Sequence, residues 1–156
     1  MDHRVARSQF KRGLTLLRGR RPELALPHIR QAVVLQENDP HYLSYFGVAI
    51  AMAKQRWATA ELYCQRALRM KRDEARLHLN LAEVYLSAGR RHDAVETLKR
   101  GLQCARRPSL LIRALSRIVL RRRPLLPFLD RKHFLNYYSG FVRHHFLCLL
   151  SFLAQL

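Results

Sequence analysis

The most constraining feature of this sequence is an internal repeat. Three segments in tandem, which begin near Ala6, Pro40 and Ala75, share one pattern of small and bulky residues. In each segment a small residue precedes a large apolar one by three positions. After a turn, a second small residue is followed four positions later by a bulky residue and seven positions later by another small one. These spacings keep the side chains on one side of an α-helix, so the pattern predicts paired helices.

The alternation of small and bulky residues has a packing reason. Small residues on one helix let the paired helix approach closely, and bulky residues fill the gaps beside them. The repeated positions are Gly13, Leu16, Pro22, Ala25, Ile29 and Ala32 in the first segment; Leu43, Phe46, Gly47, Ile50, Trp57, Ala60, Cys64 and Ala67 in the second; and Leu81, Ala82, Tyr85, Gly89, Ala94, Leu98 and Gly101 in the third.

The pattern also predicts where the helices begin and end. Asp39-Pro40 and Asp73-Glu74 are typical helix starts, because an acidic side chain is favourable near a helix N-terminus and proline fits the first turn. Ser109 is the expected N-cap of a helix that follows the repeats. The predicted helices span residues 4–18, 22–37, 40–54, 57–71, 74–88, 91–105 and 109–122.

The third segment, which reads L-x-x-N-L-A-E-V-Y-L-S-A-G-R-R-H-D-A-V-E-T-L-K-R-G-L from Leu77 to Leu102, resembles the tetratricopeptide repeat. That repeat is a helix–turn–helix of 34 residues, and Gly89 stands where the family places its turn glycine. The resemblance covers residues 6–102. It implies an all-α chain, a TPR-like α-solenoid of three helix-turn-helix repeats, closed by a solvating helix because a terminal repeat would otherwise expose an apolar face.

The other two segments depart slightly from the family pattern. Gly47 and Ala60 lie thirteen residues apart, one more than the family spacing, which indicates a one-residue insertion in the turn near residues 54–56. The first segment has Arg20 and Arg21 in its turn and Glu37 where the family usually has a closing proline.

The sequence changes character after the repeats, and we expect three parts: a superhelix with its capping helix over 1–122, a strap over 123–140 and an apolar helix over 141–156. Pro124 and Pro127 break any regular helix in the strap. The run R-R-P-L-L-P-F-L-D-R-K-H-F-L-N resembles a tail that follows the repeats in small bacterial TPR proteins.

Residues 141–156 are apolar nearly all round, so such a helix must be hidden from water. Three interpretations remain open. The helix folds back on the repeats, pairs with a partner or a second copy, or lies in a membrane surface. The stretch is shorter than the ~20 residues of a membrane span. The residues expected to make tail interactions are Arg121, Arg122, Arg123, Phe146 and Leu150.

The formal net charge is +18, and residues 106–156 hold ten basic side chains against one acidic, Asp130. Such a field attracts nucleic acid, anionic lipid or an acidic protein, although a solvated arginine-rich surface would also fit. The N-terminal residues lack the apolar run of a signal peptide, and the three cysteines contain no C-x-x-C, so we expect a cytoplasmic protein with buried thiols.

The resemblance also implies a binding surface, since the first helices of TPR pairs line a concave groove. The groove positions used for binding are Arg7, Lys11, Leu14, Arg18, Tyr45, Val48, Met52, Arg76, Asn80 and Glu83. Some family members clamp a peptide carboxylate with lysine, arginine and asparagine. Tyr45 departs from the usual asparagine, and Glu83 would repel an acid. We therefore favour a groove for an acidic, apolar helix or extended peptide.

Motifs of catalysis are absent from the sequence: there is no GxGxxG, GxxxxGK[ST], HExxH or GxSxG. His144 and Cys148 have metal-ligand spacing but lack further ligands, and Cys64 and Cys104 occupy positions expected to pack between helices. We expect no enzyme, no cofactor and no metal. The leading hypothesis is a protein-interaction adaptor, with pairing of its last helix into a homo-oligomer as one option. The alternative is a basic nucleic-acid-binding or membrane-associated helical protein acting through its tail.

Overall fold

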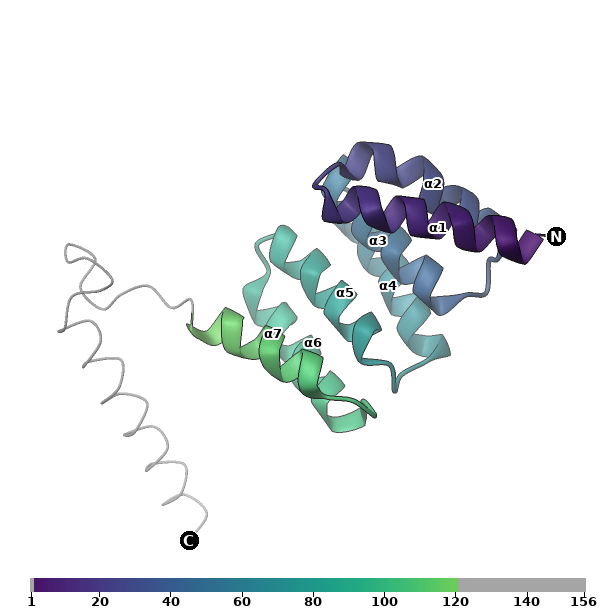
Figure 1. Ribbon diagram of the computed structural model, residues 1–156. Coiled ribbons are helices and arrows are strands. Elements are labelled where there is room, and N and C mark those ends of the chain that lie inside the picture. The colour runs from purple at the N-terminus through teal and green to yellow at the C-terminus, as the bar shows by residue number, and fades with distance from the viewer. Residues whose placement is uncertain (1, 121–156) are drawn as a thin grey trace, which may run out of the picture. The chain divides into compact units, whose positions relative to one another are not determined.

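A computed structural model describes residues 2–120, which form seven α-helices without any strand (Figure 1). The all-α solenoid expected from the repeats is confirmed. The helices are α1 (Asp2–Arg18), α2 (Pro22–Leu35), α3 (Pro40–Lys54), α4 (Trp57–Met70), α5 (Ala75–Ser87), α6 (Arg91–Cys104) and α7 (Ser109–Leu120).

Each repeat pairs its two helices through a small residue of the first helix. A Cβ atom added to Gly47 would lie 2.6 Å from Sγ of Cys64 and 2.7 Å from the carbonyl oxygen of Ala60, and one added to Gly13 would collide with Ile29. The glycines are therefore required by the close approach of the helices. Ala25, Ala60 and Ala94, the equivalent residues of the second helices, are all fully buried.

The turns inside the three repeats share one backbone feature. Arg20, Gln55 and Gly89 have φ angles of 56°, 53° and 76°, and each stands two residues before the second helix of its repeat. In Figure 1 the α1–α2 and α5–α6 turns lie on the same side, and the α2–α3 and α4–α5 connections lie on the opposite side.

The structure refines the expected insertion in the second repeat. Counted from the small residue of the first helix, α3 extends two residues further than α5, and only Gln55 and Arg56 separate it from α4. The third repeat has three residues, 88–90, in its turn. Compared with the third repeat, the second repeat therefore has a first helix that is longer by two residues and a turn that is shorter by one. The sequence pattern did not indicate this distribution.

Two of the expected helix starts differ in their capping. Oδ1 of Asp39 accepts hydrogen bonds from the backbone N–H groups of His41 (2.8 Å) and Tyr42 (3.1 Å), as expected for an N-cap. Ser109 is not a cap, because it is already the first residue of α7 and Pro108 supplies the carbonyl that Ile112 bonds at 3.0 Å.

The last described helix, α7, closes the core of the third repeat. Leu111 is fully buried, and Leu115 and Ile118 pack partly buried against the same cluster as Leu98 and Leu81. This arrangement covers an apolar face that α5 and α6 would otherwise present to water.

A polar cluster joins the second and third repeats, and we call it the Glu61 cluster. The hydroxyl of Tyr85 donates to Oε1 of Glu61 at 2.6 Å, and Nη1 of Arg90 lies 2.7 Å from Oε2 of Glu61. Arg90 also pairs with Asp93 at 2.6 Å and stacks over the Tyr85 ring at 4.6 Å. One carboxylate thus binds α4 to both ends of the α5–α6 turn.

The expected strap over 123–140 and the apolar helix over 141–156 lie outside the described residues, as do Arg121, Arg122, Arg123, Phe146 and Leu150. Among the helices of residues 2–120, none combines the length and the apolar character that crossing a membrane requires.

Candidate partner-binding surface

The outward faces of α1, α3 and α5 form what we call the first-helix surface. On α1 it carries Arg7, Lys11, Leu14 and Arg18, whose spacings of four, three and four residues place them along one face. That face points away from Gly13, which contacts α2. The three cationic side chains are exposed and Leu14 is half-buried. The helix therefore presents a row of positive charge with an apolar residue inside it.

On α3 the surface is partly aromatic and apolar. Tyr45 is half-buried and meets the ring of Phe10 edge to face, with 5.5 Å between the ring centroids. Phe10 also packs on Tyr42 at 4.4 Å. Met52 keeps 38% of its surface exposed. Tyr45 is thus held in place by the first repeat, while Met52 remains available for contact.

Two of the residues expected in the groove are used inside the molecule. Asn80 is 2% exposed, and its side-chain amide donates a hydrogen bond to the buried hydroxyl of Ser44. Val48 is 3% exposed and belongs to the core. Because both side chains are buried, neither can contact a partner, and we exclude both from the first-helix surface.

The charges of this surface are unequal. Arg7, Lys11 and Arg18 make no ion pair with any residue of the described chain. Glu83 on α5 is the acidic member. The surrounding helices partly desolvate this carboxyl and so raise its pKa, and the nearby Arg76 offsets part of that rise. The side chain of Glu83 is nevertheless exposed at the surface. The surface is therefore suited to an acidic partner.

Several features were missed by the sequence reasoning. The Phe10–Tyr42–Tyr45 contacts and the Asn80–Ser44 hydrogen bond link first helices of different repeats. No pattern within one repeat indicates the burial of Asn80, because its partner Ser44 belongs to the preceding repeat. Trp57, one of the repeated positions of the sequence pattern, is half-buried and packs against the core.

The thiols of the described chain differ in their surroundings. Cys64 is fully buried, its thiol donates to the carbonyl of Ser44 at 3.4 Å, and burial raises its pKa to about 12. It therefore carries no thiolate at neutral pH. Cys104 was expected to pack between helices, but it is exposed at the end of α6, where the side chain bonds the carbonyl of Arg100 at 3.1 Å.

The described residues contain one group of potential metal ligands, formed by His92, Asp93 and Glu96. Asp93 is paired with Arg90 and Glu96 with Arg100, and His92 has 92% of its side chain exposed. The carboxylates are thus already neutralised by arginines, and the arrangement is an ordinary exposed ion-pair network.

Comparison with known proteins identifies the array. The sequence model of the tetratricopeptide repeat family matches residues 51–118. No curated protein matches the sequence significantly. Among solved structures, the chain resembles "YrrB: a TPR protein with an unusual peptide-binding site", with 24% identity and a TM-score of 0.58 over 70% of this chain and 56% of that one.

A second likeness is to MamA, with 20% identity and a TM-score of 0.53 over 74% of this chain and 72% of that one. The chain spans little more than half the length of YrrB. Residues 51–118 thus match the tetratricopeptide repeat family, and the described helices share the fold of these two solved structures.

Proposed function

We propose that the protein is a non-enzymatic interaction adaptor whose first-helix surface binds an acidic, partly apolar segment of another protein. The observation that carries the proposal is the row of Arg7, Lys11 and Arg18, which make no ion pair within residues 2–120, on a surface that also carries the exposed Met52 and the half-buried Leu14. Tetratricopeptide repeats bind proteins or peptides, and the peptide-binding site of YrrB supports such a role for this array.

The chemistry of the surface supports an acidic partner over a neutral one. Guanidinium groups bind carboxylates with paired hydrogen bonds, and Glu83 is the acid that opposes them on this surface. Leu14, Tyr45 and Met52 offer apolar contact between the charges. A partner segment in which acidic and apolar residues alternate would satisfy both parts, whether helical or extended.

The test is quantitative capture of partners from a native lysate. The bait is the full chain, compared with the charge-reversal variant Arg7→Glu/Lys11→Glu/Arg18→Glu. Reversal of three exposed cations should reduce the captured amount of a true groove partner by at least about tenfold, because like charges across an interface are strongly unfavourable. Mass spectrometry measures the amounts.

A matched control reverses three exposed arginines on other faces, Arg12→Glu/Arg30→Glu/Arg66→Glu. The same change in net charge should leave capture of the groove partner nearly intact. If both variants lose the same partners to the same extent, binding depends on net charge alone, and the proposed surface is wrong. The nucleic-acid and membrane alternatives rest on residues 121–156 and stay predictions.

A further inference from the structure

A second surface lies between α4 and α6, on the side of α5 opposite the first-helix surface. Here α4, α5 and α6 line an open groove of about 550 Å³. Its floor contains His78, Leu81 and Tyr85, which helical geometry places on the face of α5 opposite Arg76 and Glu83. A partner in this groove would therefore not contact the first-helix surface.

The groove is basic at its rim and apolar at its floor. The side chains that line it include three arginines, two glutamines and several apolar groups, with no acid: Gln65, Leu68, Arg69, Arg72, Leu81, Tyr85, Arg100 and Gln103. Arg100 is paired with Glu96, but Arg69 and Arg72 make no ion pair with the described residues. The acids nearest to them in sequence, Asp73 and Glu74, are already engaged by Arg106 and Lys71. Two cations thus remain unneutralised.

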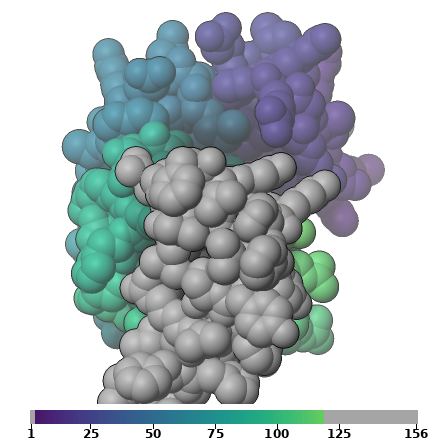
Figure 2. Space-filling view, turned by 90° about the vertical axis from the view of Figure 1, so that its left-hand side faces the viewer, coloured from purple at the N-terminus to yellow at the C-terminus, as the bar shows by residue number. Residues whose placement is uncertain are grey.

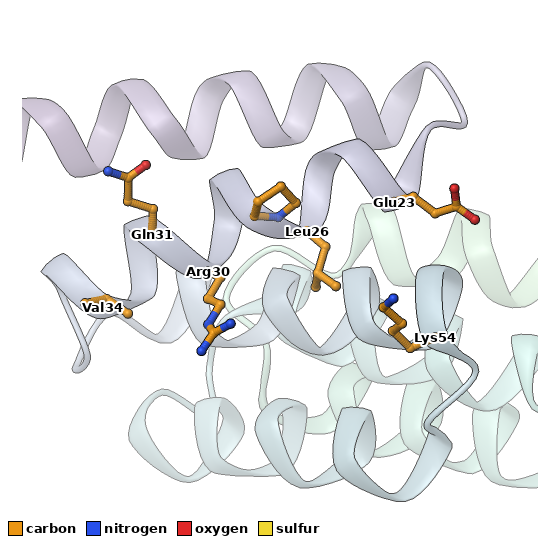
Figure 3. Close-up of a pocket in the computed structure, with 7 residues that line it drawn as sticks. Glu23, Leu26, Arg30, Gln31, Val34 and Lys54 are labelled. Atoms are coloured by element: carbon orange, nitrogen blue, oxygen red, sulfur yellow. The ribbon is translucent and has the colours of Figure 1, made fainter.

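The equivalent positions of the first repeat show that this charge is not a property of every repeat. Val34 and Glu37 on and after α2 stand where α4 and its end have Arg69 and Arg72. Figure 3 shows the cavity beside α2, which is lined by the acidic Glu23 together with the basic Arg30 and Lys54. Val34, the equivalent of Arg69, also lines it. The first cavity is lined by charges of both signs, whereas the lining of the groove between α4 and α6 contains three arginines and no acidic side chain.

We propose that this groove is a second docking site, and that its occupant is an acidic peptide segment of a partner protein. Carboxylates of the segment bind Arg69 and Arg72, and apolar side chains between them cover Leu68 and the floor. Arginine is suited to this because its planar guanidinium binds a carboxylate through two hydrogen bonds. An array with such a site on each face joins two acidic segments at once, which a single groove does not.

Cys104 lines this groove and is exposed, so it reports on occupancy. The experiment measures the rate at which a bulky maleimide alkylates Cys104. It uses the full chain with Cys148→Ser, so that Cys104 and the buried Cys64 are the remaining thiols, and burial protects Cys64. The probe is a short synthetic peptide in which leucine and glutamate alternate, and the control peptide has glutamine in place of glutamate. Peptide binding is measured in parallel by fluorescence anisotropy.

The acidic peptide should slow alkylation of Cys104 severalfold, and the glutamine peptide should not. Arg69→Ala/Arg72→Ala should abolish this protection at peptide concentrations that protect Cys104 in the unsubstituted groove, because two charge-assisted contacts are lost. The matched variant Arg30→Ala/Arg66→Ala, with the same loss of charge, and the first-helix variant Arg7→Ala/Lys11→Ala should both keep the protection.

The proposal would be overturned by no protection of Cys104, by equal protection by the glutamine peptide, or by protection that survives Arg69→Ala/Arg72→Ala. Protection that disappears in Arg7→Ala/Lys11→Ala would also overturn it, because the peptide would then be bound by the first-helix surface. Circular dichroism of each variant verifies the fold. Failure of this site leaves the adaptor proposal intact, since that proposal depends on other residues.

Discussion

Gly47 illustrates how closely single residues determine the packing of this array. Its missing side chain leaves room for the carbonyl oxygen of Ala60 and the thiol of Cys64. The third repeat has Ala82 at the equivalent position, so the requirement for glycine belongs to the contact between α3 and α4 and not to every repeat. A methyl group there must displace backbone atoms, which cannot move as a flexible side chain could.

We therefore expect Gly47→Ala to lower the free energy of unfolding by about 1–3 kcal/mol, the usual range for overpacking a core. The control is Gly19→Ala in the α1–α2 turn, where the new Cβ would lie 3.5 Å from its nearest neighbours. That variant should be close to neutral. Urea unfolding followed by circular dichroism measures both, and equal stability of the two variants would contradict the close approach at Gly47.

Because the pKa of Tyr85 is raised in the folded protein, the free energy of unfolding should fall as the pH rises in the alkaline range. Burial and the hydrogen bond to Glu61 raise its pKa to about 12, above the usual value for tyrosine. The native state therefore favours the neutral phenol, and this contribution is complete below pH ~10 and lost as the pH rises towards ~12. Cys64, with a pKa of about 12, adds to the same loss.

The variant Tyr85→Phe should be less stable than the wild type at neutral pH, because Glu61 loses a hydrogen bond. Its stability should fall less between pH 10 and pH 12, since one of the titrating groups is gone. Urea unfolding across this range provides the measurement. Parallel curves for the two proteins would show that Tyr85 does not titrate with a raised pKa.

At the scale of elements, the small residues and the turn glycine predicted the number and order of the helices, and most boundaries agree within two residues. The sequence did not predict how α3 absorbs its additional residue, because helix length and turn length trade against each other without changing the apolar pattern. The prediction that Ser109 is the N-cap of α7 was also wrong, since the carbonyl of Pro108 accepts the first hydrogen bond of this helix.

Prediction of the surface was less complete than prediction of the fold. The family resemblance selected Arg7, Lys11 and Arg18, and the structure shows that these three side chains are exposed. The resemblance could not distinguish Asn80, which is buried because Ser44 of the preceding repeat offers a hydroxyl partner. Contacts between repeats decide such cases, and a pattern within one repeat does not contain them. The basic groove between α4 and α6 was missed for the same reason.

The capping role of α7 gives a prediction at the element scale. Leu111→Ala should reduce the free energy of unfolding by about 2–5 kcal/mol, because a fully buried leucine is removed from the core. The neighbouring Ile112 is 56% exposed, and Ile112→Ala should change stability by less than about 0.5 kcal/mol. Thermal unfolding compares the two variants. A small effect of Leu111→Ala would mean that α7 does not close the third repeat.

At the scale of the whole described array, neighbouring repeats share one continuous surface. Figure 2 shows the first repeat in purple beside the second in blue, with the third in teal below the second. Phe10 with Tyr45, Ser44 with Asn80 and the Glu61 cluster fix each repeat on the next. The residues that we propose for partner binding come from three different helices and are thereby held in a constant arrangement, which would reduce the entropy lost when a partner binds.

The most direct test of the adaptor account is photo-crosslinking in intact cells. A benzoylphenylalanine replaces either Met52 on the first-helix surface or Leu24 on α2, which have 38% and 55% of their surfaces exposed. The account predicts crosslinks from position 52 to a specific protein partner through an acidic segment, and none from position 24 to that partner. Equal crosslinking from both positions, or from position 24 alone, would contradict it.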